Sequence, residues 1–132
     1  MLSIDELLQM PYWIIDILPM QVPKDSPGQY FPVAKYFLSK KRLTEIKQMH
    51  INVILKLNCY KGISLDDETE VNPAPDRIAD EMLRRYVNIR VDDSLIISEA
   101  DDTHMTLFNA DDELLGLIRQ FAASEGLFVW KP

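Results

Sequence analysis

Two pairs of aspartates are the first candidates for chemistry in this sequence. Asp92 and Asp93 fall between two predicted strands, and Asp111 and Asp112 fall at the start of a predicted helix. Both segments are expected at the same end of an antiparallel meander, so the four carboxylates are predicted to lie close together and to gain from a cation or a basic protein partner. The alternative is a local task for each pair, the first in a turn and the second at a helix start.

A second set of polar residues is predicted on the polar faces of three strands. It consists of Asp16, Lys56, Asn88 and Arg90. If the three strands are neighbours, these side chains form a charged patch that is suited to a small polar ligand. The alternative is that they are simply the hydrated side of a sheet, because antiparallel sheets commonly leave one face to water.

Motifs for catalysis are absent from the sequence. His50 and Cys59 bracket a predicted strand and would therefore lie about 30 Å apart, too far to form a dyad. The four glycines are scattered and form neither a phosphate-binding loop nor a dinucleotide fingerprint. The sequence thus predicts no catalytic residues, no metal site and no cofactor.

The elements that position these residues follow from hydrophobic periodicity and from helix and turn signals. A capping box at Ser3–Glu6 starts a short helix that Pro11 ends. The expected elements of the first half are then a strand at Tyr12–Leu18 in which Asp16 is the one charge, a loop over Pro19–Gly28, an interrupted helix from Pro32 to Ile46, and a strand at Ile51–Leu57. The basic residues Lys35, Lys40, Lys41, Arg42 and Lys47 are interpreted as a solvated helix face.

The second half contains a polar loop from Lys61 to Pro75 and a helix that begins at Pro75. Three alternating strands follow at Tyr86–Val91, Ser94–Ser98 and His104–Phe108, then a helix capped by Asn109 and a strand at Leu127–Trp130. This order predicts an α+β fold: a two-layer sandwich with a mixed sheet of five to six strands. It begins β-α-β-α-β, continues as a meander and ends β-α-β, with helices mainly on one face.

Composition limits the function classes. The 132 residues fit a single globular domain over 1–132, and the net charge of −7 disfavours nucleic-acid binding. Residues 67–132 hold 15 Asp or Glu and 6 Lys or Arg, so the acid is concentrated there. The single cysteine, the short apolar runs and the lack of a signal-peptide pattern predict a cytoplasmic protein that does not enter a membrane.

These patterns favour a small acidic cytosolic protein that is not an enzyme and that binds or regulates another protein, as an inhibitor or adaptor does. Asp92, Asp93, Asp111 and Asp112 are the predicted partner-binding residues. The alternative is a small-ligand-binding protein or minor enzyme that uses the polar sheet face, and a homodimer is a third possibility.

Overall fold

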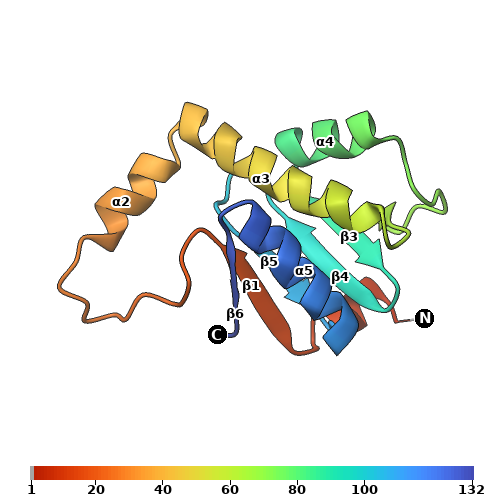
Figure 1. Cartoon of the computed structure of the whole chain (residues 1–132), viewed down its shortest axis with the longest axis horizontal. Coiled ribbons are helices and arrows are strands. Elements are labelled where there is room, and N and C mark those ends of the chain that lie inside the picture. The colour runs from red at the N-terminus through yellow and green to blue at the C-terminus, as the bar shows by residue number, and fades with distance from the viewer. Residues whose placement is uncertain (1) are drawn as a thin grey trace.

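The computed structural model describes residues 2–132, which form five helices and one six-stranded sheet (Figure 1). The helices are α1 (Ile4–Leu7), α2 (Tyr30–Phe37), α3 (Lys40–Asn58), α4 (Pro75–Arg84) and α5 (Asp112–Ser124). The strands are β1 (Tyr12–Asp16), β2 (Ser64–Leu65), β3 (Val87–Val91), β4 (Ser94–Ser98), β5 (Met105–Phe108) and β6 (Phe128–Trp130). The predicted α+β class is confirmed.

The sheet has the strand order β2-β3-β4-β5-β1-β6, and every neighbouring pair is antiparallel. The predicted meander is β3-β4-β5. The prediction of a mixed sheet was wrong, because β1 lies between β5 and β6 and is antiparallel to both. β5 and β6 therefore run in the same direction without touching. The loop predicted between Lys61 and Pro75 also contributes a strand, because β2 pairs with β3.

The prediction of a strand at Ile51–Leu57 was wrong, because this segment is the second half of the 19-residue helix α3. The opening order is therefore β-α-α rather than β-α-β. A short apolar run has no decisive period, and the run here continues a helical spacing that begins at Ile46 and recurs at His50 and Ile54. On a helix the nine-residue step from His50 to Cys59 spans ~13 Å rather than about 30 Å.

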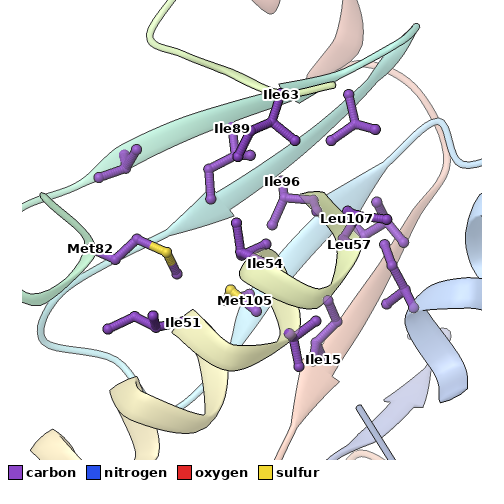
Figure 2. Close-up of a cluster of buried hydrophobic side chains, with 14 of the residues drawn as sticks. Ile15, Ile51, Ile54, Leu57, Ile63, Met82, Ile89, Ile96, Met105 and Leu107 are labelled. Carbon is purple, nitrogen blue, oxygen red and sulfur yellow. The ribbon is translucent and has the colours of Figure 1, made fainter. Parts of the chain in front are cut away.

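Helices α3, α4 and α5 cover one face of the sheet (Figure 1), and their buried side chains meet those of the strands there. Figure 2 shows this core, in which Ile54 and Leu57 of α3 lie among Ile15, Ile89 and Ile96 of the strands, all fully buried. The short helix α1 lies on the opposite face, where Leu7 packs against Leu95 and Phe108. The helices are thus mainly on one face, as predicted.

Residues 18–38, here called the arm, connect β1 to α3 and consist of a proline-containing loop followed by α2. Helix α2 has no buried residue, and the exposed fraction of the Phe31 side chain reaches 82%. In Figure 1 the arm extends away from the sheet beyond β1 and β6 before the chain returns to α3. None of the described helices is long and apolar enough to cross a membrane.

Candidate functional site

Strand pairing brings two titratable residues together at the end of β1. Ile15 is in register with Met105 of β5, and both side chains are buried in the core. Side chains alternate along a strand, so Asp16, which follows Ile15, and His104, which precedes Met105, lie on the opposite face of the sheet. The antiparallel register places these two residues, which are far apart in the sequence, across from each other.

His104 is held by a second carboxylate. Its Nδ1 lies 2.8 Å from Asp102 Oδ1. This hydrogen bond raises the pKa of His104, burial opposes the rise, and the negative charges of Asp102 and Asp16 reinforce it. Burial works to raise the pKa of Asp102, but the hydrogen bond and charge of His104, helped by backbone donors, hold it below its usual value. The two residues therefore favour the charged pair, with a protonated imidazole.

Asp16 is less well satisfied. The backbone N–H of Ile17 donates to Asp16 Oδ1 at 2.7 Å, and no cation among residues 2–132 lies within ion-pair distance of the carboxylate. Burial raises the pKa of Asp16, which backbone hydrogen bonding and the charge of His104 offset only in part. The Trp130 indole N–H is close enough to lower this pKa, but its buried Nε1 forms no well-aligned hydrogen bond with any described residue. The Asp16 carboxylate can therefore accept a further hydrogen bond, and the Trp130 indole N–H can donate one.

Two adjoining hollows lie between the arm and the sheet, with volumes of about 540 Å³ and about 290 Å³. They share Asp16, Leu18, Tyr30 and His104, so we treat them as one space and call it the arm cleft. The larger hollow is lined mostly by apolar side chains, among them Ile14, Met20, Val22, Phe31 and Trp130. The arm cleft thus combines apolar walls with a few convergent polar groups, as ligand pockets commonly do.

Two further titratable residues are buried behind this site, on α3. Lys47 is 1% exposed and its Nζ donates to Ser98 Oγ at 2.8 Å. Burial lowers the pKa of Lys47 to about 8, although Asp102 and two other nearby carboxylates oppose the change. Burial also lowers the pKa of His50 to about 3, and neither of its ring nitrogens has a well-formed hydrogen bond within residues 2–132. Lys47 therefore does not belong to the solvated basic face predicted for it.

The four residues predicted for a ligand patch do not come together. Lys56 lies on α3 rather than on a strand, and its Nζ is 2.6 Å from Glu125 Oε2. Arg90 and Asn88 lie on β3, which β4 and β5 separate from β1, so three strand spacings of ~4.8 Å stand between them and Asp16. Arg90 is occupied locally by Asp67 at 3.1 Å and by the Leu2 carbonyl at 2.7 Å. Only Asp16 of this set lies at the arm cleft.

The four predicted partner-binding aspartates lie at one end of the sheet and are exposed. The two segments touch, because Asn109 Nδ2 donates to the Asp93 carbonyl oxygen at 2.9 Å. Lys61 lies between them, 3.7 Å from Asp92 and 2.9 Å from Glu113. Asp111 caps α5 by accepting the Leu114 N–H, so this position belongs to it and not to Asn109. In residues 2–132 no group of three His, Cys, Asp or Glu is placed to hold a metal ion.

Sequence reasoning missed His104, Asp102, Trp130 and Tyr30 as parts of one site. The available signal was Asp16, a lone charge in an otherwise apolar strand that needed either solvent or a partner. Finding that partner required the pairing of β1 with β5, which joins residues about 90 positions apart.

Comparison with known proteins adds no identification: no family model matches the chain, and no match is found among curated proteins or solved structures.

Proposed function

We propose that this protein is a non-enzymatic binding protein whose ligand occupies the arm cleft. The observation that supports this proposal is the convergence of Asp16, His104 and Trp130 on one largely apolar space of about 540 Å³. That volume lies within the range of ~300–1,000 Å³ that small-molecule sites typically have. Perturbed pKa values in a cleft are a further mark of functional sites, and Asp16 and His104 both have them.

Binding rather than turnover is the better assignment for this cleft. The described residues that line it include no cysteine. Its serine, Ser26, is engaged by the backbone, because its Oγ accepts the Gly28 N–H at 3.3 Å. Asp102 holds His104 in one orientation, but no activated nucleophile lies beside the imidazole within the described lining.

A metabolite screen by thermal stabilisation tests the proposal. A ligand that binds the folded state raises the melting temperature by mass action. The shift should shrink in Asp16→Asn and should persist in Asp25→Asn, a matched change in the arm at a residue that does not line the cleft. A panel that stabilises neither the wild-type protein nor the control would remove the support for this function.

The second candidate is the binding of a basic protein partner through the acidic end of the sheet. The observation that favours it is the placement of Asp92, Asp93, Asp111 and Asp112, all exposed, on two touching segments. Changing all four to Asn should weaken capture of a basic partner and reduce its salt dependence while leaving the fold intact. Unchanged affinity in that variant would exclude these residues from the interface.

A further inference from the structure

We propose that the arm cleft selects a small cationic ligand, an ammonium or guanidinium group carried on an aromatic or branched apolar body. This inference rests on the proposed function and assigns the chemical class of its ligand. Three features of the cleft support it: the sign of the charge on its floor, the unfilled hydrogen-bonding capacity of Asp16, and the aromatic character of its walls.

The charges around the floor of the cleft have a negative sum. Asp16 comes from β1, and Asp102 and His104 come from the segment before β5. With His104 protonated these three groups total −1, and with His104 neutral they total −2. Glu99 and Asp101 add negative charge in the same turn, and the buried Lys47 of α3 adds one positive charge behind it. A cation entering the cleft therefore meets a favourable field, whereas an anion meets an unfavourable one.

Asp16 is the group best placed to receive that cation. It is half-buried, and its close donors are backbone N–H groups: that of Ile17 lies 2.7 Å from Oδ1, and that of Leu18 also lowers the carboxyl pKa. A carboxylate removed from water without full compensation is costly, and a bound ammonium or guanidinium would offset that cost with charge-assisted hydrogen bonds. His104 contributes charge to Asp16, but among the described residues its ion pair is the one from Nδ1 to Asp102 at 2.8 Å.

The walls favour an apolar or aromatic body attached to the cation. Trp130 and Ile14 are cross-strand partners on the same sheet face as Asp16. Tyr30 and Phe31 of α2 stand opposite, with their ring centroids 5.4 Å apart at an interplanar angle of 72°. Aromatic faces attract cations and stack on flat apolar groups. A ligand with a charged head at Asp16 and an aromatic body between these walls uses both features.

Lys24 provides a test of sign, because it is the one basic residue of the arm that lines the cleft and it is exposed. An anionic ligand would use Lys24 together with His104 and would be repelled by Asp16. A cationic ligand would use Asp16 and would be repelled by Lys24. Asp16→Asn and Lys24→Gln therefore shift the affinity in opposite directions for the two classes of ligand.

The experiment compares three probes that share a phenyl body: phenethylamine, phenylpropionate and phenethyl alcohol. Each is titrated by calorimetry into the protein comprising residues 1–132, with the Trp130 indole N–H followed by NMR. We expect phenethylamine to bind most tightly. Its affinity should fall about tenfold or more in Asp16→Asn, stay equal or rise in Lys24→Gln, and stay unchanged in the control Asp25→Asn.

Other outcomes overturn the inference in distinguishable ways. Preference for phenylpropionate with loss of affinity in Lys24→Gln, or equal binding of all three probes, refutes a cationic ligand but leaves a binding cleft. Binding of a Phe-Lys peptide amide without binding of phenethylamine assigns the cleft to a protein partner. If no probe and no metabolite binds, both the inference and the proposed function fall. The three probes decide the charge preference on the wild-type protein, even if Asp16→Asn does not fold.

Discussion

The two faces of the sheet differ in how they are covered: one carries a closely packed apolar core, and the other carries the arm cleft. On one side, α3, α4 and α5 cover a layer of fully buried aliphatic side chains such as Ile15, Ile54 and Leu57 (Figure 2). On the other, beyond β1, the arm covers an open cleft, and its helix α2 has no fully buried residue. Apolar burial is the dominant favourable term in folding, so the larger part of the stability comes from the first side. The smaller cluster of Leu7, Leu95 and Phe108 adds to it on the other side. The second side is free to vary in chemistry, which is the usual condition of a binding site.

The largest effect should come from a truncation in the core. Ile54→Ala removes a fully buried side chain of α3 from the centre of the helix–sheet contact. Such changes lower the free energy of unfolding by about 2–5 kcal/mol, through lost transfer energy and the cavity left behind. Urea denaturation followed by circular dichroism measures the loss. A change below about 1 kcal/mol would show that this layer is not the main source of stability.

The buried His50 should make stability fall in acid. The unfolded chain binds a proton at His50 below about pH 6.5, whereas burial lowers the pKa of the folded residue to about 3. Stability from this group is thus present at neutral pH and decreases as the pH falls towards 3, with a slope of up to ~1.4 kcal/mol per pH unit.

The window between about pH 4.5 and 6 suits His50, because ordinary carboxylates titrate mostly below it. Burial raises the pKa of Asp16, so the wild-type protein is compared there with a His50 variant that retains Asp16. His104 is protonated there in both the folded and the unfolded state, since its folded pKa is raised. His50→Leu should flatten the dependence of the unfolding free energy on pH across this window. An unchanged slope in the variant would mean that another group accounts for the acid sensitivity.

Replacing the buried Lys47 should change the free energy of unfolding less than Ile54→Ala does, and it should raise this free energy or leave it unchanged. Its side chain is 1% exposed with one hydrogen bond to Ser98, so Lys47→Met removes a desolvated charge and leaves an apolar side chain of similar length. Replacement of buried charges by apolar groups is often neutral or stabilising by ~1 kcal/mol or more. Thermal unfolding at pH 7 measures the change, with the exposed Lys41→Met as the matched control. A loss above about 2 kcal/mol would contradict this account.

The pH dependence sharpens the Lys47 prediction. Because burial lowers the folded pKa of Lys47 to about 8, the unfolded chain holds its proton more firmly between pH 8 and about pH 10. The stability contribution of this group therefore rises as the pH increases through that range. The rise should be absent in Lys47→Met and retained in Lys41→Met.

The smallest effect is expected in the arm. Phe31→Ala removes a large apolar side chain, but 82% of its surface is already exposed. Exposed substitutions typically change the free energy of unfolding by less than ~0.5 kcal/mol. The same urea titration used for Ile54→Ala provides the measurement. A loss comparable to that of the core variant would mean that the arm helps to hold the fold together.

The parts of the fold that were predictable are those in which local pattern and tertiary environment agree. The alternation of Val87, Ile89 and Val91 identified β3, and the short turns after it identified the meander. The segment Ile51–Leu57 failed because a run of consecutive apolar residues suits a buried helix and a buried strand equally well. Lys47 was misplaced for a related reason: its charge indicated solvent, whereas its position on α3 faces the sheet.

The candidate site was predictable only at Asp16. A charge among Ile14, Ile15 and Ile17 is conspicuous in the sequence, and it does lie at the cleft. His104 and Trp130 carry no comparable local signal, since each becomes significant through pairing with β1. The same limit explains Arg90 and Lys56, which periodicity grouped with Asp16 but which the strand order and the helix α3 place elsewhere.

The position of β1 between β5 and β6 has a consequence for synthesis on the ribosome. β1 is the first strand of this sheet in sequence order, yet both of its neighbours come from residues 105–130. At a typical elongation rate of ~5–20 residues per second, β1 waits roughly 5–20 s for β5. During that interval the run from Trp13 to Ile17, which is apolar except for Asp16, has neither of its partner strands. The sheet can therefore be completed only after β5 and β6 have been synthesised, and a nascent chain that stops before β5 leaves β1 without either of its partners.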